Sequence, residues 1–399
     1  MMQLINYFKK GQKFSQTQDI GLEVEHFIID KQTGQPMPYS KISQVLYEIS
    51  DQFDTSYYEQ GQLMGLENTW ILITLEPGCQ LEISLACMSD LDQFFSIYHA
   101  CITQIRQIIE PMGYEIVYSG GLPTVSSRQV QRIDKKRYQY MEAWFQQVGT
   151  RGLEMMKATA AVHVSVDYSD EKDFVLKYRL ANILHPIFAF LTSNTKQYAG
   201  QQNEDLLLRD SIWHHTDDAR CGVIPTLFEE DFGFIHYAKW LSDLPLIVMH
   251  DHDEFIDAKD LNVQQAMEIY GQQPEQISHY LSMSFLDIRL KRFIEIRSAD
   301  SMPEWYAKSY CALIKGIFYQ PEIVQKYQSL CDSIVQIEEA KTSLRKADWQ
   351  ARVYDISIMD LCTSLFEDAK NGLSIQEQEM LKPLQALMEH QSHIYKEVQ

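Results

Sequence analysis

The sequence predicts an α+β protein in which helices pack on the outer side of a mostly antiparallel β-sheet. Segments rich in β-branched and large apolar residues alternate apolar with polar positions over part of their length, as half-buried strands do. Long segments with helical periodicity separate them, which favours layers of helix on sheet. Strands are expected at 21–30, 70–85, 160–168 and 291–297. Helices are expected at 90–112, 173–193, 274–286, 305–318 and over most of the chain after Pro321.

We treat the chain as one catalytic domain spanning residues 1–399. Its 399 residues are 45% hydrophobic, enough to bury a large core. It has neither low-complexity linkers nor internal repeats that would mark a boundary. Residues 321–399 are amphipathic and rich in Glu, Gln and Lys, so we expect them to form a peripheral helical region.

The charge balance restricts the class of ligand. The formal net charge is -20, without a long run of Lys or Arg, which argues against nucleic acid as a partner. The run Lys135, Lys136 and Arg137 is interpreted as a solvated face, with a mobile basic loop near a nucleotide as the alternative. An anionic substrate would therefore need metal ions or a few focused Arg residues.

We expect a cytoplasmic protein without a membrane segment. No apolar stretch approaches the roughly 20 residues that span a bilayer, and the first residues lack an apolar signal core. Seven scattered cysteines without CxxC spacing argue against a disulfide framework and against a zinc cluster. The sequence leaves both a monomer and a homo-oligomer open.

Four strand segments place polar or charged side chains on one face and apolar side chains on the other. Glu23 and Glu25 are two residues apart and project from the same face of a strand. The remaining same-face pairs are Gln80 with Glu82, His163 with Ser165, and Glu295 with Arg297.

An ordinary half-exposed strand is the simplest interpretation of any one of these segments. The four together are unusual, because Glu recurs where solvated strands favour Thr and Lys. Like charges on neighbouring strands repel unless a cation lies between them. Mg²⁺, or Mn²⁺ in its place, would relieve this repulsion and neutralise a polyphosphate. The pattern therefore predicts a metal and nucleotide site on the sheet.

Five stretches in this order resemble the glutamate-cysteine ligase family, in particular its plant and proteobacterial branch, within the glutamine synthetase-like superfamily. They are GLEVEHF from Gly21, LEPGCQLEIS from Leu75, MMKATAAVHVSVDY from Met155, LRDSIWHHTDDARCG from Leu208 and RLKRFIEIRSADSMP from Arg289. The resemblance covers roughly residues 18–320. It implies an antiparallel sheet curled into a funnel, with helices outside, that binds ATP, Mg²⁺, glutamate and cysteine.

The resemblance also implies roles for residues. The residues implied as metal ligands are Glu23, Glu25, Glu82, His163 and Glu295. Arg297 is implied to meet the transferred γ-phosphate, while Arg209 and Trp213 are implied to hold the substrate amino acids. Three residues match the pattern without an assigned role: Glu76, Arg220 and Arg292.

Two positions depart from the family pattern. Cys79 replaces the second glycine of an LEPGG turn, and Ala158 replaces the Arg of MMLRTCT. Cys79 would be strained if its φ is positive. Loss of the Arg removes an anion-binding fork, which Lys157 could replace only with poorer geometry.

The leading functional hypothesis is an ATP-dependent ligase that joins the γ-carboxylate of glutamate to the amino group of cysteine through a γ-glutamyl phosphate. Phosphoryl transfer to a carboxylate needs positioning and charge neutralisation, which metal ions and one Arg supply. Two alternatives remain: a γ-glutamyl ligase with a different amine acceptor, favoured by Ala158 and Cys79, and a catalytically silent regulatory relative.

Overall fold

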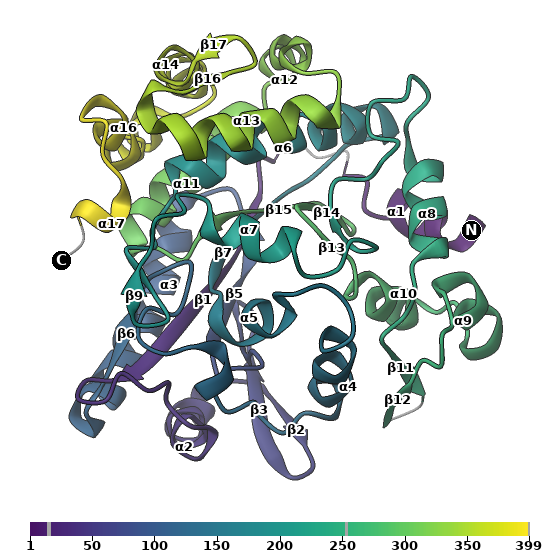
Figure 1. Cartoon of the computed structure of the whole chain (residues 1–399), viewed down its shortest axis with the longest axis vertical. Coiled ribbons are helices and arrows are strands. Elements are labelled where there is room, and N and C mark those ends of the chain that lie inside the picture. Colours follow the sequence, from purple (N-terminus) through teal and green to yellow (C-terminus); the bar gives the residue numbers. More distant parts are fainter. Residues whose placement is uncertain (14–16, 252–253, 398–399) are drawn as a thin grey trace.

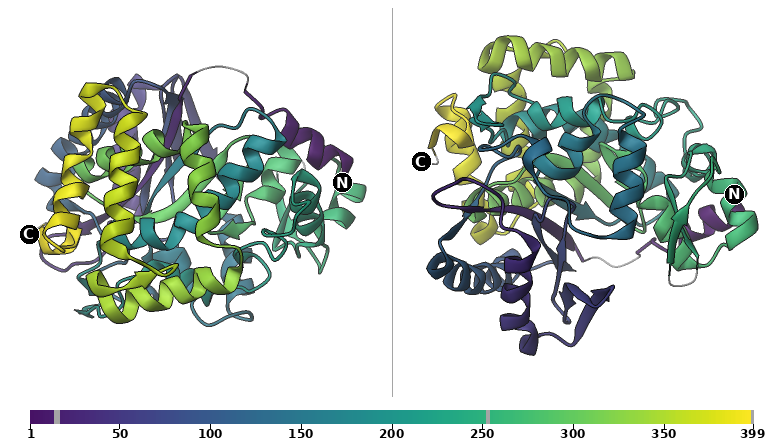
Figure 2. Two further views of the ribbon diagram at one scale, coloured as in Figure 1. Left: turned by 90° about the horizontal axis from the view of Figure 1, so that it is seen from above. Right: turned by 60° about the horizontal axis from the view of Figure 1, so that its bottom comes forward.

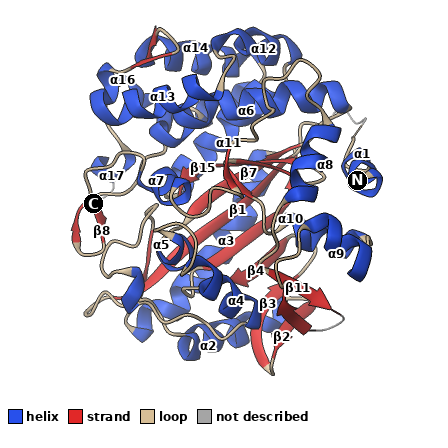
Figure 3. Cartoon of the chain, turned by 45° about the vertical axis from the view of Figure 1, so that its right-hand side comes forward, coloured by secondary structure: helices blue, strands red, loops and turns tan. Residues whose placement is uncertain are grey.

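The fold is built around one long, twisted antiparallel sheet (Figures 1 and 3). The computed structural model describes residues 1–13, 17–251 and 254–397. Within these residues the main sheet has nine strands in the order β14-β15-β7-β1-β5-β4-β3-β2, with β6 paired to β1. Every neighbouring pair in it is antiparallel, which confirms the expected class. The strands are β1 (Ile20–Asp30), β2 (Thr55–Glu59), β3 (Gln62–Glu67), β4 (Ile71–Leu75), β5 (Leu81–Met88), β6 (Tyr114–Val117), β7 (Ala161–Val166), β14 (Ile288–Leu290) and β15 (Ile294–Asp300).

Each of the four segments expected to form a strand contains one, but one of these segments is divided. The expected strand 70–85 is two strands, β4 and β5, joined by a turn over residues 76–80. Pro77 lacks a backbone donor and Cys79 adopts φ 65, so a continuous ladder cannot pass through this segment. Four strands of the main sheet were not predicted: β2, β3, β6 and β14. Most of β2 is exposed along this free edge of the sheet, so its side chains show no apolar alternation.

Seventeen α-helices surround the sheet in the described ranges. They are α1 (Met2–Lys9), α2 (Tyr39–Ile49), α3 (Leu91–Ile109), α4 (Lys136–Phe145), α5 (Gly152–Ala158), α6 (Glu171–Leu191), α7 (Leu208–His214), α8 (Phe234–Asp243), α9 (Val263–Tyr270), α10 (Pro274–Leu281), α11 (Glu304–Phe318), α12 (Pro321–Lys326), α13 (Ile334–Ala347), α14 (Ile358–Asn371), α15 (Ile375–Met380), α16 (Lys382–Glu389) and α17 (Ile394–Glu397). The helix expected at 274–286 ends at Leu281. The short strand β13 (Phe285–Leu286) follows it and pairs in parallel with β10 (Cys221–Gly222).

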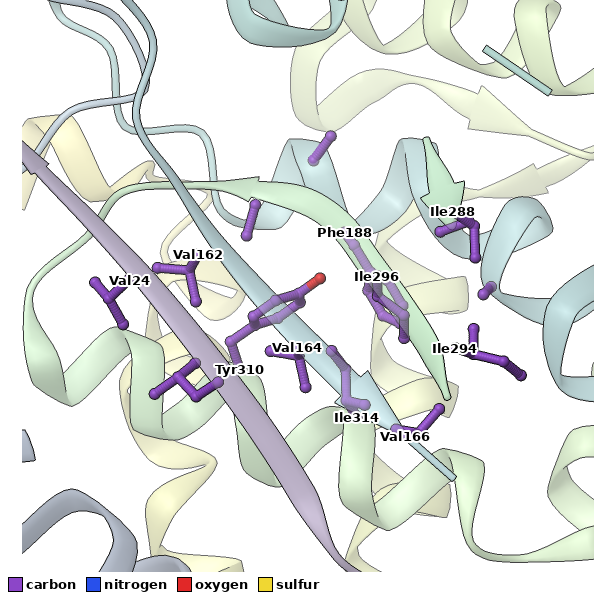
Figure 4. Close-up of a cluster of buried hydrophobic side chains, with 14 of the residues drawn as sticks. Val24, Val162, Val164, Val166, Phe188, Ile288, Ile294, Ile296, Tyr310 and Ile314 are labelled. Atoms are coloured by element: carbon purple, nitrogen blue, oxygen red, sulfur yellow. The ribbon is translucent and has the colours of Figure 1, made fainter. Parts of the chain in front are cut away.

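The apolar face of the sheet packs against two long helices. Figure 4 shows Val24, Val162, Val164 and Ile296 from three neighbouring strands packed in one cluster with Phe188 of α6, and with Tyr310 and Ile314 of α11. These side chains are almost completely buried. Because strand side chains alternate between faces, this packing directs the polar residues of the same strands to the opposite face.

Helix α6 is a core helix of the fold. By length and composition it could cross a membrane, but 83% of its most apolar window is buried inside the protein. Its N-cap Asp170 accepts a hydrogen bond from the Asp173 amide, and Pro186 lies inside the helix. The apolar character of α6 therefore reflects packing on the sheet on one side and on the C-terminal helices on the other.

The C-terminal helices lie on the side of α6 and α11 away from the sheet (Figures 1 and 2). Helix α13 packs along α6, while α14 and α16 contact α11. A short hairpin of β16 (Arg352–Val353) and β17 (Ile356–Ser357) interrupts this otherwise helical region. The single-domain assignment for 1–399, with a helical region from 321, stays a prediction.

Candidate active site

The strand register gathers the acidic residues on the polar face of the sheet. Glu25 of β1 lies opposite Glu82 of β5, and Glu23 lies opposite His163 of β7. Glu295 of β15 lies opposite Ser165, the second polar residue of β7. Two carboxylates directly opposite one another destabilise an antiparallel pair unless a cation is present. The polar face of the sheet therefore carries a cluster of carboxyl groups whose charges require compensation.

A cavity of about 430 Å³ opens over this surface. Helices α4, α5 and α7 stand on its far side, so helices also cover the polar face of the sheet. Six residues predicted from the sequence line the cavity: Glu23, Glu25, Glu82, His163, Trp213 and Arg297. Glu295 is completely buried beneath it, and Arg209 borders a small adjoining hollow that shares Trp213 and Arg297 with the cavity.

Three carboxyl groups in the cavity lack a close cationic partner among the described residues. Burial and the Glu76 carboxylate raise the pKa of Glu25 to about 8. Burial, followed by the negative charges of Glu23, Glu76 and Glu25, raises the pKa of Glu82 well above its usual range. The pKa of Glu76 is also raised, mainly by burial. These three groups, Glu25, Glu76 and Glu82, form the unpaired carboxyl cluster.

Two other carboxylates are neutralised by the protein itself. Burial raises the pKa of Glu23, but the Lys291 ammonium and the imidazole of His163 bring it down to about 2. Burial also opposes ionisation of Glu295, yet its neighbouring cations hold its pKa well below the usual range. Lys291 Nζ lies 2.5 Å from Glu295 Oε1 and 3.8 Å from Glu23 Oε1. Arg289 Nε lies 2.6 Å from Glu295 Oε2. We call Glu23 and Glu295 the paired carboxylates.

His163 has the form that a metal ligand requires. Its Nδ1 lies 3.1 Å from Glu23 Oε2, while Nε2 is buried and has no hydrogen-bond partner among the residues that the structure describes. Burial and the positive charge of Arg297 lower the pKa of His163 to about 4, so the ring is neutral near pH 7. In the tautomer that donates from Nδ1 to Glu23, Nε2 keeps a free lone pair directed by that carboxylate.

Arg297 lies between the acidic strands and the wall formed by α7. Its Nη1 donates to Glu295 Oε2 at 3.1 Å, and its guanidinium lies 5.3 Å from the centre of the Trp213 ring. Arg209 donates to the Arg297 carbonyl oxygen and lies 3.6 Å from Asp300. The indole Nε1 of Trp213 is buried, and within the described part of the chain it has no hydrogen-bond acceptor, so this donor can serve a ligand.

A family comparison identifies the chain. The sequence model of glutamate-cysteine ligase family 2 (GCS2) matches residues 19–390. The chain belongs to this family. The chloroplastic glutamate–cysteine ligase A of Oryza sativa subsp. japonica is 30% identical over 384 residues, which cover 93% of this chain and 77% of the relative. The chloroplastic glutamate–cysteine ligase of Medicago truncatula is 31% identical over 383 residues, with 93% and 75% covered.

A solved ligase has a similar fold. The crystal structure of glutamate–cysteine ligase from Francisella tularensis, in complex with AMP, superposes with a TM-score of 0.57 and covers 94% of this chain and 83% of that chain. Sequence identity is only 12%, so this similarity concerns the fold. It agrees with the α+β fold that the resemblance to the ligase family implied.

The expected cytoplasmic location is wrong by this comparison. The curated relatives at about 30% identity are named as chloroplastic enzymes in rice, Brassica juncea and Arabidopsis thaliana. The expectation depended on the absence of an apolar signal core in the first residues, a test that responds only to secretory signals. We withdraw it.

Four cations that line the cavity were not among the site residues predicted from the sequence, although the alternative interpretation of the run at 135–137 placed it near a nucleotide. Lys135, Arg137, Arg289 and Lys291 line the cavity together with Arg297. Lys135 was assigned to a solvated face, but its Nζ donates to the Leu75 carbonyl at 3.0 Å, beside the acidic turn. The run of basic residues carried no periodic signal that could have placed it over the sheet.

Two of the residues without an assigned role lie outside the cavity. Arg220 is completely buried and pairs with Asp217 at 2.6 Å, which indicates a structural role. Arg292 stacks over the Tyr7 ring of α1 at 4.7 Å. The third, Glu76, lines the cavity and belongs to the unpaired carboxyl cluster.

Both departures from the family pattern lie beside the cavity without contributing a charge to it. Cys79 has φ 65, so the condition under which this position would be strained is met, and its buried side chain faces a separate cavity of about 590 Å³. Ala158 is buried in a small apolar cluster that includes Phe27 and Leu122. Lys157 does not replace the missing Arg, because its Nζ pairs with Glu142 at 3.2 Å and its side chain is not part of the cavity lining.

Proposed function

We propose that this chain is an ATP-dependent ligase that converts glutamate and cysteine into γ-glutamylcysteine. The observation that carries the proposal is the unpaired carboxyl cluster, which lies in the same cavity as Arg297 and four further cations. Buried carboxylates without a counter-ion are costly, and a ligase that handles ATP uses them to hold divalent cations. Membership of the glutamate-cysteine ligase family supports the same conclusion.

We propose that Mg²⁺, with Mn²⁺ as a substitute, is held by Glu23, Glu25, Glu82, His163 and Glu295. The free Nε2 of His163 and the raised pKa values of Glu25 and Glu82 fit such an ion, because it would replace the bound protons as counter-charge. The Lys291 ammonium stands between Glu23 and Glu295 and would have to withdraw from one of them. When bound, the metal supplies charge neutralisation for the polyphosphate.

The protein's own residues position the reacting groups. In the first step a γ-carboxylate oxygen of glutamate attacks the γ-phosphorus of ATP, and ADP leaves. Arg297 is placed to neutralise the phosphoryl oxygens during this transfer. In the second step the amine nitrogen attacks the acyl carbon, phosphate leaves, and the ammonium protons are lost. Arg209 and Trp213, on α7, are assigned to hold the amino acids, with the free Trp213 indole N–H as a donor.

One assay tests the function. The protein is incubated with ATP, Mg²⁺ and glutamate, and phosphate release is measured with each of a panel of amines. We expect release that requires cysteine, and a product whose mass equals glutamate plus cysteine minus water. A phosphorylated small molecule as the stable product would replace the ligase proposal with a kinase. The absence of turnover with every amine would favour a silent relative.

A different amine acceptor is the second candidate. Among the described residues of α5 and its C-cap, Met155, Met156 and Thr159 line the cavity, and all three are uncharged. Ala158 is packed away, and Lys157 is paired with Glu142. This neutral wall is the observation that favours an acceptor other than cysteine. Faster release with another amine in the same panel would select this candidate.

The acceptor's thiol provides a finer prediction. Ligation consumes the amino group of cysteine, so the thiol contributes only to recognition. We therefore expect 2-aminobutyrate, which replaces the thiol by a methyl group, to be used with a several-fold lower kcat/KM. Equal kcat/KM values for the two amines would show that the site does not recognise sulfur.

A further inference from the structure

Helix α13 belongs to the C-terminal region that the sequence suggested to be peripheral, yet it sends two cations beneath the active site. Lys341 is 1% exposed, and its Nζ lies 2.8 Å from Asp210 Oδ1 and 3.1 Å from Asp287 Oδ2. Arg345 Nη2 lies 2.6 Å from Asp210 Oδ2, and its Nε lies 3.1 Å from Asp205. Figure 1 shows α13 beside α6, on the side of the molecule where α7 lies.

The two carboxylates that receive these cations are attached to the substrate wall. Asp210 follows Arg209 in α7 and precedes Trp213 by one helical turn. The backbone carbonyl of Asp287 accepts a hydrogen bond from the Arg297 amide at 3.2 Å. Asp210 is therefore connected through the α7 backbone to residues assigned to the substrate. Asp287 is connected through one backbone hydrogen bond to the residue assigned to phosphate.

His185 of α6 completes the network. Its Nε2 lies 3.0 Å from Asp210 Oδ1 and 3.4 Å from Asp287 Oδ2, while its Nδ1 lies 2.8 Å from Ser298 Oγ. Ser298 directly follows Arg297 on β15. The same residues, His185, Asp210, Asp287 and Ser298, border the small hollow that opens on Arg209, Trp213 and Arg297.

A lysine takes the place that a metal ion could occupy here. Ligand atoms of His185, Asp210 and Asp287 lie within 4.8 Å of one another, a spacing that suits a cation. Lys341 Nζ contacts both carboxylates, so the protein supplies its own counter-ion. Although burial opposes it, the charges of Asp210 and Asp287 raise the pKa of Lys341 well above its usual value, which keeps it protonated.

We propose that Lys341 and Arg345 are positioning residues that hold α7 against β15 so that Arg209 and Trp213 present their side chains to the amino-acid substrate. The inference rests on the proposed ligase function. It assigns the network to the amino-acid half of the site, because the described contacts of Lys341 and Arg345 do not include β1 or β5. Loss of the network should therefore weaken glutamate use more than ATP use.

The test variant is Lys341→Met, which keeps much of the side-chain volume and removes the charge. We expect the KM for glutamate to rise roughly 10- to 100-fold, as small displacements of binding groups do, while the KM for ATP changes by less than about twofold. Isothermal titration of glutamate, with a non-hydrolysable ATP analogue present, provides a second readout that does not need turnover. Lys341→Arg, which keeps the charge, should restore part of the glutamate affinity.

A matched control separates positioning from general destabilisation. Lys315 of α11 is 5% exposed, donates to the Ser89 carbonyl at 2.7 Å and pairs with Glu377. It lines neither the cavity nor the hollow. Lys315→Met removes a buried lysine in the same way, so it should lower the melting temperature without changing the KM for glutamate. Arg345→Met, at a 26% exposed side chain, is the milder variant if Lys341→Met fails to fold.

The outcomes are distinct. A wild-type protein that releases no phosphate with any amine overturns the proposed function, and the inference with it. The wild type could instead be active, while Lys341→Met and Arg345→Met bind glutamate as tightly as Lys315→Met. That result overturns the inference but leaves the proposed function in place. If the KM for glutamate and the KM for ATP rise by the same factor, the inference is also overturned, because such a result would indicate that the whole cavity has collapsed.

Discussion

The unpaired carboxyl cluster and the paired carboxylates belong to the same site, but the negative charge of their buried carboxyl groups is compensated in different ways. Glu25 and Glu82, on β1 and β5, keep raised pKa values because burial and the charge of neighbouring carboxylates, Glu76 in both cases, oppose ionisation. Glu23 and Glu295, toward β15, keep lowered pKa values because cations of the protein neutralise them.

This difference indicates which carboxyl groups need a cation that the protein does not supply. At the paired carboxylates the chain itself supplies Arg289, Lys291 and Arg297. At the unpaired cluster, direct ion-pair partners are absent among the described residues, so protons or metal ions must provide the counter-charge. If the protein binds the metal ion that we propose, we expect the ion to be needed chiefly at β1 and β5. We expect the phosphate contact to come from Arg297 on β15.

The largest expected effect is the loss of activity on metal removal. If the unpaired cluster holds the metal for ATP, excess EDTA should abolish phosphate release, and added Mg²⁺ or Mn²⁺ should restore it. Phosphate release at several EDTA concentrations measures this. Full turnover in metal-free buffer would remove the basis for assigning the cluster to metal binding.

Substitution of Arg297 tests the role of the cations beside the paired carboxylates. Loss of one contact to the phosphoryl oxygens typically costs about 3 to 4 kcal/mol, roughly 10²- to 10³-fold in kcat. Arg297→Lys should also lose much activity, since it keeps the charge but not the planar fork. Thermal melts of Arg297→Ala control for folding. A folded Arg297→Ala protein with near-normal kcat would assign the phosphate contact to another residue.

Matched neutral substitutions should change stability in opposite directions. Glu295→Gln leaves Arg289, Lys291 and Arg297 without their shared partner, so we expect a loss of about 3 kcal/mol in the free energy of unfolding. Glu82→Gln removes a carboxyl from the unpaired cluster, so the metal-free protein should gain up to about 1 kcal/mol near pH 8. Denaturant unfolding in EDTA measures both. Two losses of similar size would contradict the division into two classes.

The smallest expected effect is on how the stability of the metal-free protein depends on pH. The pKa of Glu25 is raised from 4.5 to about 8, so between these values the folded metal-free protein binds more protons than the unfolded chain. The associated stability is fully present below 4.5 and is lost as the pH rises through 8. We expect the melting temperature in EDTA to fall by a few degrees from about pH 6 to pH 8.5, with Mg²⁺ reversing the fall. An unchanged difference between EDTA and Mg²⁺ at the two pH values would argue against a metal at this cluster.

Local patterns predicted most of the sheet and most of the acidic residues. Strands β1, β7 and β15 were expected close to their observed bounds, because apolar residues alternate with polar ones along them. Strand β2 was missed because its exposed edge position needs no apolar face. The turn at residues 76–80 was included in one long strand because the apolar pattern continues on both sides of it.

The sequence by itself determined which side chains share a face. Glu23 with Glu25, and Glu295 with Arg297, are separated by two residues, and this spacing places them together in any β-strand. Family motifs added the expectation of ATP and a metal. These inferences need only the local geometry of the backbone, which the order of residues specifies directly.

Only the tertiary structure decided which carboxylates receive a cation. Lys291 neutralises Glu23 across two strand pairings, and Lys341 reaches Asp210 from a helix in the C-terminal region. Lys135, on the run assigned to a solvated face, instead lines the acidic cavity. Such contacts join segments far apart in sequence, and their distances are set by strand register and helix packing. Charge neutralisation depends on these distances, so a local pattern of residues cannot specify it.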